Sequence, residues 1–224
     1  MTSTPAPFPV NQLVAGEGVL EASIRWGEAE GDDPLLLHAI TVHLGSLSLG
    51  GGVEDTAPKL RLHSIRFPVS SWTQLQGRAY RFPNLVRCVV ADGESDPIYD
   101  IYGSLKIGDR YHEVVPSLLR FDPDTGCTLG VHLDAEINPT DTPPSFASTA
   151  FTLDAELTVA VVRVVGDAAS PDYPSLTEAS ELSRQLLDLN RYAAPVVKDG
   201  CVTFAPRCAG GRPATSLKKP AVGP

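Results

Sequence analysis

The chain has 224 residues, of which 42% are hydrophobic and 20% charged, and its formal net charge at pH 7 is −9. This composition is ordinary for a soluble globular protein, and the length allows one large β domain or two small ones. The negative charge argues against a nucleic-acid-binding surface spread over the molecule. No apolar run approaches the roughly 20 residues of a membrane-spanning helix, and the N-terminus lacks a signal-peptide pattern. We therefore expect a cytoplasmic protein without membrane contact.

Alternating apolar and polar residues, typical of half-buried strands, recur along most of the chain. Residues 1–12 contain three prolines and are expected to form a loose arm. Strands are predicted over residues 19–26, 35–44, 59–69, 76–82, 85–91, 98–107, 110–115, 127–137 and 151–165, with a short hairpin over 196–204. The Gly108-Asp109 pair predicts a two-residue hairpin turn between two of these strands.

The segment 151–165 gives the strongest strand signal. Its apolar residues share one parity and its polar residues the other, from Phe151 to Val161. Beyond Val161 the alternation changes phase, and an unbroken strand would point Arg163 into the core. A β-bulge or the end of the sheet would explain the change.

One segment has helical periodicity. Ser175 and Glu178 have the spacing of a capping box, and the following leucines and alanine lie on one face. This pattern predicts a helix over 175–191. From Ala205 onward the chain carries four basic residues and no acidic one, which predicts a disordered basic tail over 205–224.

These elements indicate an all-β protein, an antiparallel β-sandwich or flattened barrel of about nine to eleven strands with one C-terminal α-helix. The helix is too short to be stable alone. Residues 13–204 are therefore expected to form a single domain, with the helix packed on a face or across an open end.

Motifs for catalysis are missing from the sequence. The cysteines show no CxxC spacing and, without a secretory signal, are expected to be free thiols. They are Cys88, Cys127, Cys201 and Cys208. Neither GxSxG nor HExxH occurs, so nucleophilic and zinc-protease chemistry have no direct support. We expect no cofactor, and a non-enzyme is favoured.

The candidate site is the polar face of the segment 127–137, which carries His132, Asp134 and Glu136. The simplest interpretation is a solvated strand face. A second interpretation depends on His112, which points into the core if the Gly108-Asp109 turn places it opposite Leu105.

The turn at 122–126 decides between the two interpretations. If it pairs its strands symmetrically, His112 lies opposite Glu136, and His112, His132, Asp134 and Glu136 converge inside the protein. If Pro116 introduces a bulge, the phase is reset and they stay apart, which is the interpretation we favour. Converging, the four could hold a divalent metal, with His132, Asp134 and Glu136 as ligands, or serve as an acid/base pair.

Three functions remain open on the sequence alone. The first is a non-catalytic protein-interaction or assembly module, with a protein partner or self-association through an unpaired strand edge and the basic tail. The second is a small-ligand binder that uses the interior of a barrel. The third is a metal-assisted or acid/base enzyme using His112, His132, Asp134 and Glu136. We favour the first because catalytic motifs are missing.

Overall fold

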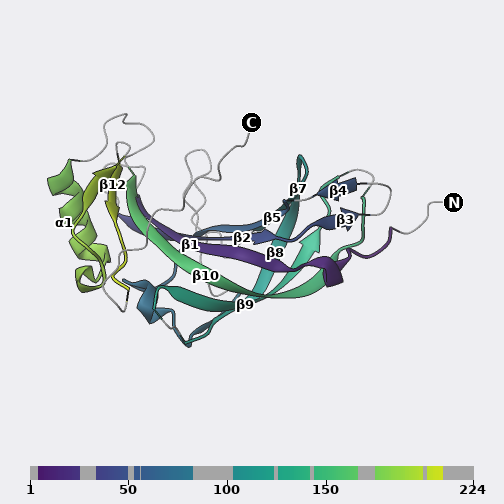
Figure 1. Cartoon of the computed structure of the whole chain (residues 1–224), viewed down its shortest axis with the longest axis horizontal. Coiled ribbons are helices and arrows are strands. Elements are labelled where there is room, and N and C mark those ends of the chain that lie inside the picture. Colours follow the sequence, from purple (N-terminus) through teal and green to yellow (C-terminus); the bar gives the residue numbers. More distant parts are fainter. Residues whose placement is uncertain are drawn as a thin grey trace, which may run out of the picture.

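The computed structural model describes residues 5–25, 34–49, 53–55, 57–82, 103–123, 126–141, 144–165, 175–198 and 201–208. Its centre is a closed barrel of seven strands (Figure 1). The strands of the barrel are β1 (Ala15–Arg25), β2 (Leu35–Leu44), β5 (Lys59–Ile65), β7 (Gly103–Ile107), β8 (Arg110–Phe121), β9 (Thr128–Asn138) and β10 (Thr149–Val165). They neighbour one another in that order. The all-β class is therefore confirmed, in its barrel form.

The barrel closes between its first and last strands. Strands β1 and β10 pair in parallel, whereas the other neighbours in the barrel are antiparallel. The barrel is thus mixed, which differs at this seam from the antiparallel expectation. Gly18 lies on the seam, where an added Cβ would be 2.6 Å from the main-chain oxygen of Glu156. Glycine at position 18 therefore lets β1 and β10 lie close together, because it has no side chain.

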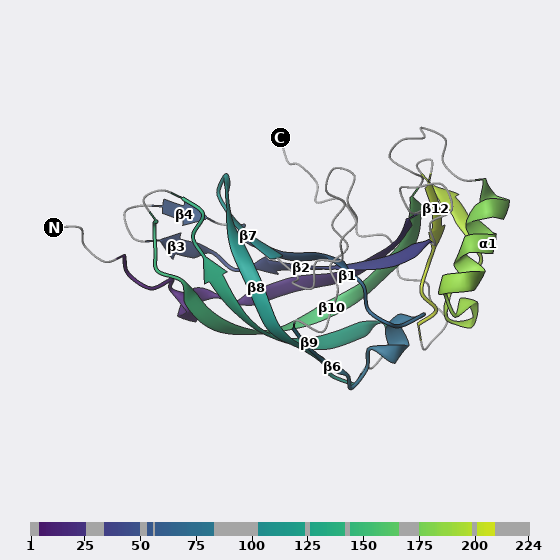
Figure 2. The same ribbon diagram turned by 180° about the vertical axis from the view of Figure 1, so that it is seen from behind.

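Further elements surround the barrel, as seen from behind in Figure 2. They are β3 (Leu47–Leu49), β4 (Val53–Asp55), β6 (Ala79–Arg81), β11 (Val196–Lys198), β12 (Cys201–Phe204), the helix α1 (Leu176–Leu186) and 3-10 helices at Val10–Gln12, Trp72–Gln74 and Leu189–Arg191. β3 and β4 form a hairpin, β6 pairs with β8, and β12 and β11 extend the sheet from β10. The described strands number twelve, one more than the nine to eleven expected, because β3 and β4 lie where no strand was predicted.

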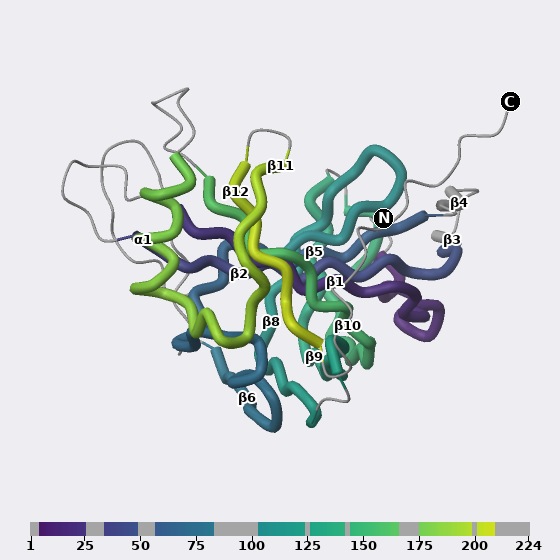
Figure 3. Tube along the Cα trace, turned by 60° about the vertical axis from the view of Figure 1, so that its left-hand side comes forward, coloured from purple at the N-terminus to yellow at the C-terminus, as the bar shows by residue number. Residues whose placement is uncertain are grey.

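Helix α1 lies beside β12 at one end of the barrel, opposite the end that carries β3 and β4 (Figures 1 and 3). The capping box is confirmed, since Glu178 N–H donates to the Ser175 hydroxyl and Ser175 N–H donates to the Glu178 carboxylate. The helix ends at Leu186 rather than at residue 191, because Leu187 is extended and buried and a separate 3-10 turn follows. Ala179 and Ser183 form its buried side.

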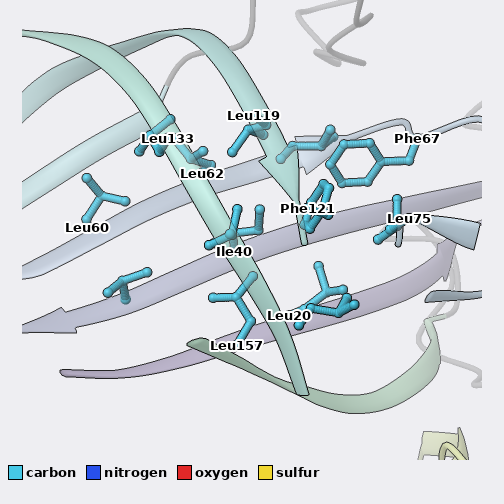
Figure 4. Close-up of a cluster of buried hydrophobic side chains, with 14 of the residues drawn as sticks. Leu20, Ile40, Leu60, Leu62, Phe67, Leu75, Leu119, Phe121, Leu133 and Leu157 are labelled. Carbon is cyan, nitrogen blue, oxygen red and sulfur yellow. The ribbon is translucent and has the colours of Figure 1, made fainter. Parts of the chain in front are cut away.

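Apolar side chains fill the inside of the barrel (Figure 4). Among the most deeply buried are Ile40, Leu60, Leu62, Leu119, Phe121 and Leu157. Burying one such side chain contributes about 1.5–3 kcal/mol, so the shared interior is the main source of stability. In the described part of the chain the interior is thus packed rather than open.

The phase change in β10 is a bulge. Leu20 of β1 pairs with Val159 and Ala22 pairs with Val162, so β10 has one extra residue between these pairs. After the bulge Val162 and Val164 are buried, and Arg163 lies outside, 3.9 Å from Glu21. The sequence-based explanation of this segment is confirmed.

A disulfide joins Cys127 to Cys208, with sulfur atoms 1.96 Å apart, at a sequence separation of 81. The expectation of free thiols was therefore wrong for these two cysteines, while Cys201 is free. The residues just before Cys208 also pack against the rest of the protein, since Arg207 N–H donates to the carbonyl of Arg191. Residues 205–208 thus belong to the fold rather than to the tail. Cys88, the strand expected at 85–91 and the tail residues 209–224 lie outside the described residues.

The N-terminal arm also packs more closely than its prolines suggested. Phe8 is buried and its ring lies against that of Phe146, with centroids 4.8 Å apart. Pro7 forms a bridge with Ala147. One aromatic side chain anchors the arm to the barrel. Within the described ranges, no helix has both the length and the apolar character needed to cross a membrane.

Candidate functional site

The candidate side chains on β9 lie on the outer face of the barrel. His132 Nδ1 is 2.7 Å from Asp154 Oδ1, and its Nε2 is 3.1 Å from Asp134 Oδ1. The hydrogen bond to Asp154 raises the pKa of His132, and the charges of the two carboxylates add to that effect. Glu136 lies further along the same face. The sheet thus brings His132 together with Asp134 and with Asp154 of the neighbouring strand. Sequence analysis did not single out Asp154.

His112 lies on the other side of the same sheet. It pairs with Leu105 as the two-residue turn predicted, it is buried, and its ring centroid is 4.9 Å from that of Phe146. Burial lowers the pKa of His112, an effect that the charge of Asp141 opposes. Its Nδ1 has no hydrogen-bond partner in the described structure.

A bulge in β8 separates His112 from the other three. Pro116 pairs with Ala135 and Leu118 pairs with Asp134, so Ser117 is the extra residue. Proline suits this position because it has no N–H to place in the ladder. The bulge expected at Pro116 is confirmed, and the four residues do not converge. The described residues hold no group of three or more His, Cys, Asp or Glu side chains placed to bind a metal.

A hollow of about 310 Å³ lies elsewhere, on the outer surface where β5, β2, β1 and β10 run side by side. Its border includes Glu21, Arg25, Leu37, Arg61, His63 and Arg163. Leu37 is on the outer face of β2 but is buried, and it gives the hollow an apolar part. The volume is at the lower end of the range of small-molecule sites.

Two bulges meet at the middle of this hollow. Glu21 of β1 pairs with Ala39 of β2. On one side β10 has its extra residue opposite Glu21. On the other, β5 places two residues, His63 and Ser64, opposite Ala39, and Ser64 has a left-handed φ of 58°. Bulges bend strands and redirect side chains, often beside functional sites, and a left-handed φ is uncommon outside glycine.

The charges around the hollow are mostly positive. Arg25, Arg61 and Arg163 come from three different strands, and Arg163 Nη2 is 3.9 Å from Glu21 Oε1. That pair is partly exposed and therefore weak. In the described part of the chain, neither Arg25 nor Arg61 pairs with a carboxylate. In a chain with a net charge of −9, this is a local reversal of sign.

His38 borders the hollow from the barrel side. Its ring lies in the core against Phe67, with centroids 5.1 Å apart. Burial lowers the pKa of His38 to about 4, although a hydrogen bond with the backbone of Ile65 opposes this. The imidazole is therefore neutral near pH 7 and adds no charge to the hollow.

Sequence reasoning did not find these arginines as a group. Arg25 and Arg61 lie on the polar parity of their strands, which is the ordinary place for arginine. Arg163 lies on the apolar parity of its strand and points outward only because of the bulge. Closure of β1 against β10 then brings Arg163 beside the residues of β1. The change of alternation after Val161 indicated a bulge in the sequence. It could not show which residues of other strands would lie next to Arg163.

Comparisons of the chain with protein-family models, curated proteins and solved structures gave no match.

Proposed function

We propose that the protein is a non-catalytic binding module that holds a small organic anion in the hollow bordered by Arg25, Arg61 and Arg163. The observation that carries the proposal is the placement of three arginines from three strands around one hollow with an apolar part. Guanidinium groups bind carboxylates and phosphates through paired, charge-assisted hydrogen bonds. The packed barrel interior favours this outer site over a ligand inside the barrel.

A second observation that supports the proposal is the pair of bulges beside the hollow. They lie on both sides of the Glu21–Ala39 pair, and one of them keeps Ser64 in a left-handed conformation. Such a conformation costs of order 1 kcal/mol or more and persists only where the surroundings impose it. Backbone strain held beside a charged hollow supports a binding site there.

Thermal melting with a panel of small organic acids in low-salt buffer tests the proposal. A ligand at about ten times its Kd stabilises the folded state by about 1.4 kcal/mol, which raises the Tm by about 3–6 °C for a chain of this size. We expect at least one acid to do so, and the rise to shrink in high salt.

Variants decide where the acid binds. The double variant Arg61→Gln/Arg163→Gln is expected to lose the rise, whereas Arg120→Gln keeps it, because Arg120 is equally exposed but lies on β8. Absence of a response to every acid, or a response that survives in the double variant, would refute the proposal.

The broader expectation of a protein partner or self-association stays a prediction. Strand β11 is the last strand of the sheet in the described structure, and Val196 and Val197 are each 60% exposed. An exposed edge can accept a strand from a second copy. Light scattering would check self-association: a dimer that Val197→Lys dissociates supports it, and a monomer at every concentration contradicts it.

A further inference from the structure

The positions of the arginines around the hollow also restrict the form of the ligand. Arg163 pairs with Ser23, which pairs with Leu37. Arg61 pairs with Thr41, four residues further along β2. At about 3.4 Å per residue the backbones of the two arginines are about 14 Å apart along the strands. They thus come from opposite ends of the hollow.

They are also separated across the sheet. Arg61 is on β5 and Arg163 on β10, with β2 and β1 between them. Three strand spacings of about 4.8 Å place the backbones about 14 Å apart in that direction, and about 20 Å apart in total. A single small anion could contact both guanidinium groups only if the side chains of Arg61 and Arg163 extended fully toward each other. Holding both side chains in that conformation would cost side-chain entropy.

Among the described lining residues, no arginine or lysine lies between the two ends. The middle of the hollow holds the Glu21–Ala39 pair. Leu37, opposite Ser23 on β2 and mostly buried, adds a small apolar part to the lining between the strands of Arg61 and Arg163. Glu21 would repel an acidic group placed at the centre, whereas an uncharged chain can lie there. Arg25 pairs with Val165, two residues after Arg163 on β10, so it adds a second positive charge to the Arg163 end.

We propose that the ligand is a diacid, a molecule with an acidic group at each end and an uncharged, largely apolar middle. One acidic group binds at the Arg163 and Arg25 end, and the other at the Arg61 end. This inference rests on the proposed function, since it names the class of anion that the same hollow takes.

Titration calorimetry with a chain-length series tests it. The probes are the dicarboxylates malonate, succinate, adipate and suberate, with octanoate and inorganic phosphate as single-headed anions. We expect affinity to rise with chain length and suberate to bind at least about 10-fold more tightly than octanoate, because only suberate makes the second charge-assisted contact.

Single substitutions give the matched comparison. Arg61→Gln and Arg163→Gln are each expected to reduce the affinity for suberate about 10-fold. Octanoate has a single acidic group and can use only one end of the hollow. One of the two variants should therefore keep its affinity for octanoate within a factor of about three. Arg120→Gln is the control and should change neither. All three arginines are exposed, so their replacement is expected to leave the Tm almost unchanged.

The outcomes separate the two proposals. If octanoate or phosphate binds as tightly as suberate, and Arg61→Gln weakens it, the diacid inference is overturned while the anion site stands. If affinity does not depend on chain length, the diacid inference is likewise overturned. If none of the anions binds, both proposals fail.

Discussion

The buried His38 should make the stability of the protein depend on pH. Burial lowers its pKa from 6.5 to about 4 in the folded state, so between these values the unfolded chain binds a proton that the folded protein does not. The free energy of unfolding is thus highest above about pH 6.5 and falls as the pH falls toward 4. Between pH 7.5 and pH 5.0 this one group should account for a loss of about 2 kcal/mol.

The measurement is urea unfolding of the wild type and of His38→Gln at the two pH values. The variant cannot take up the proton, so its loss of stability between pH 7.5 and pH 5.0 should be smaller by about 2 kcal/mol, whatever its stability at pH 7.5. The control is His43→Gln on the same strand, where the side chain is exposed, and it should keep the wild-type loss. An equal loss in the wild type and His38→Gln would refute the argument.

Two substitutions, each with a control, and one deletion test the fold. Cys208→Ser should lower the free energy of unfolding by about 2–4 kcal/mol in urea titrations, because the bond closes a long loop, whereas Cys201→Ser should have little effect. Gly18→Ala should cost about 1–3 kcal/mol because its Cβ would overlap the backbone of β10. Gly45→Ala, where a Cβ has room, is the comparison, and similar costs at both sites would contradict the seam argument. Deleting residues 209–224 should leave the melting temperature almost unchanged, and a large drop would mean that the tail stabilises the fold.

Much of the barrel could be predicted because its strands are local patterns. The alternation in residues 151–161 and 128–137 follows directly from one face being buried. The two-residue turn at Gly108-Asp109 fixed the pairing of His112 with Leu105, since so short a loop leaves one register. The start of α1 was equally local, because the capping box involves only Ser175 and Glu178.

Features that join distant segments could not be predicted in this way. No pattern within the sequence of β1 or β10 shows that these strands pair in parallel, and nothing near Cys127 identifies Cys208 as its partner. The end of α1 was also misjudged, because Leu189 keeps the helical spacing while the backbone at Leu187 is already extended. Local spacing cannot report a tertiary contact that takes the chain out of a helix.

The candidate sites differ in the same respect. His132, Asp134 and Glu136 are found together because they are neighbours on one strand, and the sheet adds only Asp154 from the next. Whether His112 joined them depended on one residue of register, which the bulge beside Pro116 decided.

The arginine hollow depends on two further bulges and on closure of the barrel. Without the extra residue in β10, Arg163 would face the core, and a buried unpaired guanidinium would destabilise the fold strongly. Without the parallel pairing of β1 with β10, Arg163 would have no relation to Arg25 or Glu21. The bulge in β5 adds His63 and Ser64 opposite Ala39. Each bulge interrupts the regular pairing of the sheet beside the hollow, and one of them holds Ser64 at positive φ. An anion bound at the Arg163 end would offset the repulsion between Arg163 and Arg25, which lie two residues apart in register.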